Sequence, residues 1–312
     1  MISGKRDDDL QMTDGEFRMF AELVRLHCGL HFGPDTRFLL EKRVELRLRA
    51  LELSSFASYH YLLRNEPHAS GEFAQLIDEL TTNETYFFRE RSQLRALVEE
   101  IFTELRLRRR AHGGGPITVW SAGCSSGEEP YSILILAIEA GLVPGVDLRV
   151  YASDISRRML RKAREGVFRE ASFRETEDQL REKYFTDKNG FWRISDEVKK
   201  HVDFIHLNLL DRSKVALLGT LDAILCRNVI IYFDAECKRK VIQTFWEKLR
   251  PGGHLLLGHS ESLINLSSSF DLRHLRNDLV YRRPLPGVAD PDPWHAAAAA
   301  AITEDDEAEN GE

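Results

Sequence analysis

Short apolar segments alternate with amphipathic helical segments in the second half of the chain, and this alternation constrains the fold more than any other feature. We expect strands at 117–120, 148–152, 202–205, 221–225 and 254–257, with helices at about 128–141, 156–165 and 234–249. Apolar strands that alternate with helices form a mostly parallel α/β sheet covered on both faces. Such sheets bind ligands beyond the carboxyl ends of their strands.

Two segments depart from this alternation. Residues 10–110 carry apolar positions at helical spacing, and a Gly-Gly-Gly-Pro run at 113–116 ends their last helix, which we expect at 90–110. Residues 166–200 contain two short aromatic runs around Asn189-Gly190, and Asn-Gly is a strong hairpin signal. The sequence therefore predicts an all-helical N-terminal domain and a small antiparallel β-subdomain inserted into the sheet domain.

The net charge of −7 comes from the C-terminal end. Residues 284–312 hold eight acids and no Lys or Arg, so residues 1–283 carry a net +1. A near-neutral body is unlike the broad positive surface of a nucleic-acid-binding protein. The alanine-rich, acidic tail predicts disorder.

Neither membrane insertion nor export is indicated. No run approaches the roughly 18 apolar residues of a membrane helix, and the N-terminus does not resemble a signal peptide. The cysteines are widely spaced and form no C-x-x-C pair: Cys28, Cys124, Cys226 and Cys237. We therefore expect reduced thiols in a cytoplasmic protein, with no zinc site.

A turn of small residues follows the first expected strand. It contains Gly123 and Gly127 and leads into a helix that begins with Glu128 and Glu129. Dinucleotide folds place a phosphate at such a helix start, but two carboxylates would repel a phosphate and attract a cation. The glycine spacing also fails the dinucleotide pattern. The turn favours S-adenosylmethionine, which carries an ammonium and a sulfonium, over NAD; alternatively, the acids only complement the helix dipole.

Polar residues also follow other expected strands. Asp154 ends the second strand, where nucleotide folds place a carboxylate for ribose hydroxyls, although Asp is equally a good helix N-cap. Asn208 and Asn228 follow later strands and point to the same cleft or form turns. Tyr232 is either part of this cleft or a core aromatic. Arg89 ends a polar and aromatic loop that starts at residue 81. Its planar guanidinium suits binding of a carboxylate; alternatively, Arg89 is a surface charge.

Four segments, taken in order, resemble the CheR-type chemotaxis protein methyltransferases. They are Thr81–Arg89, Trp120–Ser132, Cys226–Phe233 and Gly258–Glu261. The similarity runs from about residue 12 to 284. It implies a Rossmann-like S-adenosylmethionine methyltransferase sheet that methylates glutamate side chains of chemoreceptors, with S-adenosylhomocysteine as the product.

The resemblance also implies roles for residues. It implies cofactor contacts from Asn83, Thr85, Arg89, Glu129, Asp154, Asn208, Leu209, Arg227 and Asn228. Between the two adjacent acids, we favour Glu129 over Glu128. The family's catalytic roles transfer to Arg89 and Tyr232. A glutamate with a pKa near 4.3 is ionised at neutral pH, so in-line methyl transfer to it needs no metal and no general base.

The implied domains are a receptor-docking domain at 10–88, a catalytic domain at 89–284 with its insertion at about 166–200, and the tail at 285–312. A basic row on one expected helix would suit acidic receptor helices: Lys42, Arg43, Arg47 and Arg49. The alternative is a solvated face, because glutamates interleave with these residues. The short turn around Asn189-Gly190 predicts no tight tethering to a peptide at the receptor's C-terminus.

Other functions remain open at this stage. The chain could methylate another protein or a small acid, or it could bind the cofactor and dock without catalysis. An NAD-dependent oxidoreductase is the remaining alternative.

Overall fold

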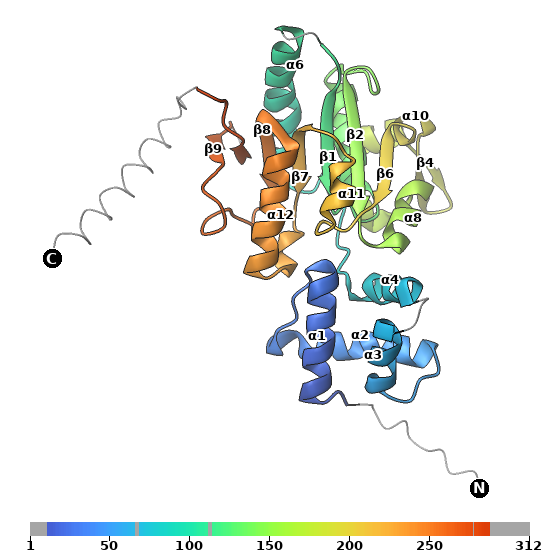
Figure 1. Cartoon of the computed structure of the whole chain (residues 1–312). Coiled ribbons are helices and arrows are strands. Elements are labelled where there is room, and N and C mark those ends of the chain that lie inside the picture. The colour runs from blue at the N-terminus through green and yellow to red at the C-terminus, as the bar shows by residue number, and fades with distance from the viewer. Residues whose placement is uncertain (1–10, 66–68, 112–113, 277, 288–312) are drawn as a thin grey trace, which may run out of the picture.

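The computed structural model describes residues 11–65, 69–111, 114–276 and 278–287. Residues 288–312, which make up most of the tail expected to be disordered, lie outside this part of the chain. Within it, a helical domain lies against one edge of a larger sheet domain (Figure 1). The expected α/β class with an all-helical N-terminal domain is confirmed.

The helical domain is built from amphipathic helices that share one core. They are α1 (Asp14–Cys28), α2 (Arg37–Ala50), α3 (Phe56–Asn65) and α4 (Ala69–Leu80). Phe20, Leu40 and Tyr59 are fully buried where their apolar faces meet. Thr13 caps α1 in a reciprocal arrangement with Glu16, which satisfies main-chain N–H groups at the start of the helix.

The main sheet has seven strands within the described residues, in the order β6-β2-β1-β7-β8-β10-β9. The parallel strands are β1 (Ile117–Ala122), β2 (Leu148–Asp154), β6 (Val202–His206), β7 (Leu221–Cys226) and β8 (Leu249–Leu257). All five expected strands are therefore present. An antiparallel pair that the sequence analysis missed, β9 (Asp271–His274) and β10 (Leu279–Arg282), extends the edge beyond β8.

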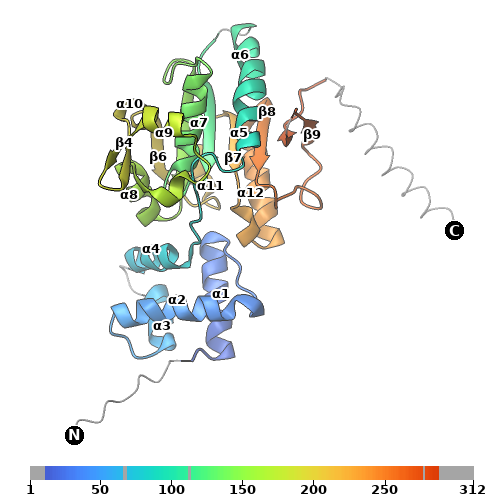
Figure 2. The ribbon, with the colours of Figure 1, turned by 180° about the vertical axis from the view of Figure 1, so that it is seen from behind.

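Helices cover both faces of this sheet. On one face lie α5 (Arg91–Ala96), α6 (Phe102–Ala111), α7 (Glu128–Glu139) and α8 (Arg157–Glu165), with α5–α7 in front in Figure 2. A π-helical turn at Leu97–Ile101 joins α5 to α6, so the expected long helix is continuous. On the other face lie α11 (Arg212–Ala216) and α12 (Ala235–Lys248).

The insertion forms a small antiparallel sheet, as expected. Its strands are β3 (Val167–Arg169), β4 (Phe185–Lys188) and β5 (Phe191–Ile194), in the order β3-β5-β4. The turn between β4 and β5 uses Asn189 and Gly190, both with left-handed backbone. Short helices flank the sheet: a 3₁₀ turn at Glu170–Phe173, α9 (Asp178–Tyr184) and α10 (Asp196–Lys199). The Phe87 ring, seven residues past the end of α4, packs on Phe173 and anchors this subdomain.

Candidate functional site

A cavity lies between the carboxyl ends of the parallel strands and the helical domain. Its wall combines segments that follow β1, β2, β6 and β7 with the loop from residue 81 to 89 and the end of α1. Every residue that the sequence analysis assigned to the cofactor or to catalysis lines it: Asn83, Thr85, Arg89, Glu129, Asp154, Asn208, Leu209, Arg227, Asn228 and Tyr232. Folding therefore brings together residues spread over 150 positions of sequence, at the edge where α/β sheets bind ligands.

The turn after β1 forms part of this wall, and its close contact with the loop after β7 requires a glycine at position 123. Gly123 has a φ of +86°, and a Cβ at this position would lie 2.4 Å from Cγ2 of Val229. The loop after β7 therefore rests directly on the turn after β1. The main chain at the turn stays open to a ligand on its other side.

The two adjacent acids at the start of α7 face different surroundings. Glu129 lines the cavity, and its Oε1 accepts a hydrogen bond from the Ser121 hydroxyl at 2.6 Å. Glu128 is 2 % exposed and accepts hydrogen bonds from the hydroxyls of Ser126 and Ser172, the latter in the inserted subdomain. Burial raises the pKa of Glu128. The preference for Glu129 as the cofactor-facing acid therefore agrees with where the two side chains lie.

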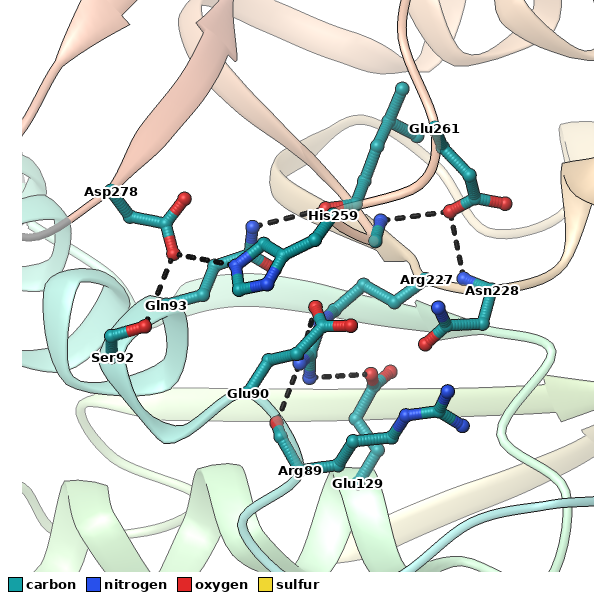
Figure 3. A network of polar contacts seen from close by, with 12 residues as sticks. Arg89, Glu90, Ser92, Gln93, Glu129, Arg227, Asn228, His259, Glu261 and Asp278 are labelled. Carbon is teal, nitrogen blue, oxygen red and sulfur yellow. Dashed lines mark hydrogen bonds and ion pairs between the residues drawn. The ribbon is translucent and has the colours of Figure 1, made fainter.

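Arg227 connects the cavity wall through a buried ion network (Figure 3). Its side chain is 2 % exposed; Nη1 lies 3.1 Å from Glu129, and Nη2 lies 3.0 Å from Glu90. Nη2 also donates to the main-chain carbonyl of Arg89. Burial would raise the pKa of Glu90, but the charge and hydrogen bond of Arg227 hold it below the usual value. The side chains of Arg227, Glu90 and Glu129 together carry one net negative charge, which favours a cationic ligand.

Asp154 is a buried carboxylate at the end of β2. It accepts hydrogen bonds from the main-chain N–H groups of Ser125 and Ser156, both at 2.8 Å. Burial raises its pKa to about 6, and the nearby charge of Asp78 adds to this effect. The N-cap of α8 is Ser156 and not Asp154, so the alternative helix-cap role does not apply.

These groups fit the cofactor that the sequence implies. Each oxygen of Asp154 accepts one of these N–H groups and keeps a lone pair that a ribose hydroxyl could use. Within the described residues, the Ser125 hydroxyl and Nε of Arg227 are buried without a hydrogen-bond partner, and both residues line the cavity. Buried polar atoms are usually satisfied, so a polar ligand in the cavity would explain these two.

The asparagines in the wall also have structural contacts. Asn208 donates to the His27 carbonyl at the end of α1, and its side-chain oxygen accepts from the Leu210 N–H in a turn. Asn228 has a left-handed backbone with a φ of +59°. Both the turn and the cleft interpretations of these residues therefore hold, because the same side chains line the cavity.

Arg89 and Tyr232 reach the cavity from two separate loops, the loop from residue 81 to 89 and the loop after β7. Arg89 donates to the Glu84 carbonyl at 2.8 Å, which keeps its guanidinium beside the loop that precedes it. Tyr232 is 36 % exposed, so it is not a core aromatic. Its carbonyl accepts a hydrogen bond from His31 N–H at 2.8 Å, which ties the loop after β7 to the helical domain.

The basic row on α2 does not form one open face. Arg43 donates to the carbonyls of Glu79 and Thr81, and Arg47 forms a two-point contact with Glu72. Both arginines therefore tie α2 to α4 and the loop after it. Lys42 and Arg49 are exposed on α2.

The sequence analysis missed several residues that hold the site. Glu90 and Ser121 support Arg227 and Glu129, and Asp78 contacts the segment after Asp154. Glu261 was quoted only as part of a motif, yet its carboxylate contacts the loop after β7. That motif was the available signal for Glu261, and the quoted segment Trp120–Ser132 was the signal for Ser121. Glu90 and Asp78 stand in ordinary polar or helical contexts.

The described residues contain no group of three or more His, Cys, Asp or Glu side chains placed to hold a metal ion. No helix among them has both the length and the apolarity needed to cross a membrane.

Both domains of the chain are similar to known proteins. Residues 83–278 match the family model for the CheR methyltransferase, SAM binding domain, and residues 15–81 match that for the CheR methyltransferase, all-alpha domain. Chemotaxis protein methyltransferase 2 of Vibrio cholerae serotype O1 is 39 % identical over 286 residues, which cover 91 % of this chain and 98 % of that protein. The chemotaxis protein methyltransferase of Escherichia coli K12 is 38 % identical over 269 residues, which cover 85 % and 90 % of the two chains.

Proposed function

Because the chain belongs to the CheR methyltransferase family, we propose that it methylates glutamate side chains of chemoreceptors and forms glutamate 5-O-methyl esters. Its place among methyltransferases that use S-adenosylmethionine and act in chemotaxis follows from the family. The proposal concerns the acceptor and the residues that act on it.

One observation carries this proposal. Arg89 and Tyr232 line the same cavity as the acidic residues Glu129 and Asp154. The acids suit the cationic donor, whereas a guanidinium and a phenol suit an anionic acceptor. A cavity with both chemistries fits transfer of a methyl group from a cation to a carboxylate.

The bound donor supplies an electrophilic methyl group on its sulfonium. We assign cofactor binding to the residues of the cavity wall: Asn83, Thr85, Arg89, Glu129, Asp154, Asn208, Leu209, Arg227 and Asn228. Arg89 orients the acceptor carboxylate, and the hydroxyl of Tyr232 donates a hydrogen bond to it. A glutamate is already ionised at neutral pH, so catalysis consists of alignment and exclusion of water.

Receptor docking is assigned to the helical domain, residues 10–88, and catalysis to residues 89–284. On α2, exposed Lys42 provides positive charge beside exposed Phe38 and Leu46, and exposed Arg49 lies on the same helix in an ion pair with Glu45. The ammonium of Lys42 lies 5.2 Å from the Phe38 ring centre. An amphipathic receptor helix with acids along its apolar edge matches this mixture. Arg43 and Arg47 contribute by holding α2 in place.

The inserted subdomain offers only a two-residue turn at Asn189-Gly190. We therefore propose that receptor recognition does not depend on tight binding of a peptide at the receptor's C-terminus. Calorimetry with that peptide tests this point: micromolar binding would contradict it.

The decisive experiment combines the purified chain, receptor-containing membranes and a donor with a tritiated methyl group. The proposal expects label on the receptor that is released as methanol by base, because methyl esters are base-labile. Arg89→Ala and Tyr232→Phe should each lower turnover at saturating donor and receptor. Label that resists base, or label that appears only on another protein or a small acid, would replace the proposed acceptor. If S-adenosylhomocysteine binds but no acceptor is labelled, a non-catalytic docking protein becomes the better account.

A further inference from the structure

The carboxylate of Glu261 accepts hydrogen bonds from the main chain of two segments, the loop after β7 and the turn after β8 that carries Glu261 itself. Within the described residues, Oε2 accepts from the N–H groups of Asn228 (2.7 Å) and Gly258 (2.8 Å). Oε1 accepts from Val229 (2.9 Å) and Ile231 (3.2 Å). Figure 3 shows Glu261 above Asn228 and separate from the Arg227 network. One side chain therefore satisfies three N–H groups of a single loop.

Among the described residues, the loop Asn228–Tyr232 pairs with no strand of either sheet. It starts with the left-handed residue Asn228 and then makes one 3₁₀ turn at Ile230–Tyr232. A non-glycine residue in the left-handed region is unfavourable, so surrounding contacts must hold it there. Without Glu261, the N–H groups of Asn228, Val229 and Ile231 would lose this acceptor.

Close packing leaves the loop little other freedom. Val229 fills the space where Gly123 would carry a Cβ. On the opposite side, a Cβ on Gly258 would lie 2.7 Å from Nδ2 and 2.8 Å from N of Asn228. The loop is therefore packed between the turn after β1 and the turn that carries Glu261. The carboxylate adds directional hydrogen bonds to this packing.

We propose that Glu261 is a positioning residue that fixes the conformation of the loop Asn228–Tyr232. Through this loop it places residues on both the cofactor side and the acceptor side of the site. This inference rests on the proposed function. Asn228, at the start of the loop, faces the cofactor, and Tyr232, at its end, faces the acceptor. A single change at Glu261 should therefore alter both cofactor affinity and methyl transfer, although Glu261 does not itself line the cavity.

The test is Glu261→Gln in the full chain. The amide has nearly the same size, but it has only one oxygen, and its NH₂ group would face two N–H donors. We expect S-adenosylhomocysteine to bind at least about tenfold more weakly by calorimetry, because main-chain donors left without an acceptor would shift the loop away from its place in the cavity wall. Receptor methylation at saturating donor should also fall, which a loss of stability alone would not cause at a temperature where the variant is fully folded.

Glu182→Gln is the matched control. It makes the same chemical change at an exposed position on α9, and both affinity and turnover should stay unchanged. Wild-type affinity and turnover in folded Glu261→Gln would overturn the inference.

Hydrogen exchange provides a second measurement that does not depend on whether the variant folds. In the wild-type protein, the amides of Asn228, Val229 and Ile231 should be protected, and fast exchange at all three would equally overturn the inference. If Glu261→Gln does not fold, Glu261→Asp keeps the charge but shortens the reach. It should expose the same three amides while those of β7 stay protected.

The measurement of S-adenosylhomocysteine binding also separates this inference from the proposed function. If the wild-type chain binds S-adenosylhomocysteine but does not methylate receptors, the proposed function fails. The affinity and exchange measurements on Glu261 would still decide the positioning role.

Discussion

Asp78 of the helical domain accepts a hydrogen bond from the hydroxyl of Ser156 in the sheet domain at 2.6 Å, and both residues are buried. The Ser156 hydroxyl in turn accepts from the Met159 N–H and caps α8. Two residues earlier stands the cavity carboxylate Asp154. The helical domain is thus joined by a buried polar contact to the segment that carries the cavity carboxylate. A shift of α4 would therefore move Asp154 relative to the rest of the cavity wall.

The first prediction concerns this contact. Asp78→Ala removes the acceptor for the Ser156 hydroxyl and for the Arg158 N–H. We expect a loss of about 2 kcal/mol in the free energy of unfolding, measured by urea denaturation, because buried donors are left unsatisfied. Asp78→Asn keeps the accepting oxygen and should lose about 1 kcal/mol or less. Equal losses in the two variants would show that the charge, and not the hydrogen bonds, matters.

The second prediction concerns pH. The raised pKa of Asp154, about 6, means that its carboxyl takes up a proton as the pH falls through 6. Ribose hydroxyls donate best to the ionised form, so affinity for S-adenosylhomocysteine should be constant above about pH 7, roughly halved near pH 6, and fall by up to about tenfold per pH unit below that. For folding the sign is opposite: ionisation of a buried carboxyl opposes folding, so its contribution to stability is lost as pH rises through 6. Calorimetry between pH 5 and 8 measures the binding effect.

Two variants check the assignment of this pH dependence. Asp154→Asn should bind weakly at all pH values and show no fall below pH 6. Asp78→Asn removes a facing negative charge and should move the midpoint to lower pH. An unchanged fall in Asp154→Asn would assign the titration to another group.

The third prediction concerns the turn after β1. Gly123→Ala places a Cβ against Val229 and forces alanine into a left-handed conformation, which costs roughly 1–2 kcal/mol before the steric clash is counted. We expect a lower unfolding temperature and weaker cofactor binding. Adding Val229→Ala should restore part of the loss by making room, but not the conformational part. If the double variant were no better than the single one, the close contact would be irrelevant.

The fourth prediction concerns the buried ion network. Arg227→Met removes the buried cation between Glu90 and Glu129 and leaves two half-buried carboxylates without it. Breaking such a network costs about 3–5 kcal/mol, measurable by denaturant unfolding. Arg95→Met is the control, because Arg95 pairs with Glu99 in solvent, and exposed pairs contribute about 1 kcal/mol or less. Similar losses in both would contradict the buried network as a source of stability.

The fifth prediction separates docking from folding on α2. Lys42→Glu reverses an exposed charge and should leave stability unchanged while it weakens receptor methylation, more at low salt than at high salt. Arg47→Glu places a carboxylate against Glu72 and should lower stability by more than about 2 kcal/mol. If Lys42→Glu and wild type methylate receptors equally at low salt, this face of α2 is not the docking surface.

Much of the fold could be read from the chain because local pattern determines it. The alternation of apolar strands and helices predicted the five parallel strands, and Asn189-Gly190 predicted the hairpin of the insertion. The pair β9–β10 was missed because its residues, Asp271–His274 and Leu279–Arg282, are mostly charged or half-exposed and lack the apolar run of a buried strand. That pair depends on the neighbouring strand β8 for its partner.

The sequence by itself determined which polar residues end the strands, since the carboxyl ends of parallel strands meet at one edge. Only the tertiary structure decided which side chains face the cavity. Glu128 and Glu129 are neighbours on a helix and point about 100° apart, so the docking angle of α7 selects Glu129. In the same way, Arg43 and Arg47 contact residues of α4 and do not face solvent as an open row. Glu261 accepts a hydrogen bond from a loop residue 30 positions earlier in the chain. These outcomes depend on contacts between distant segments, and spacing along one element cannot encode the partner on another.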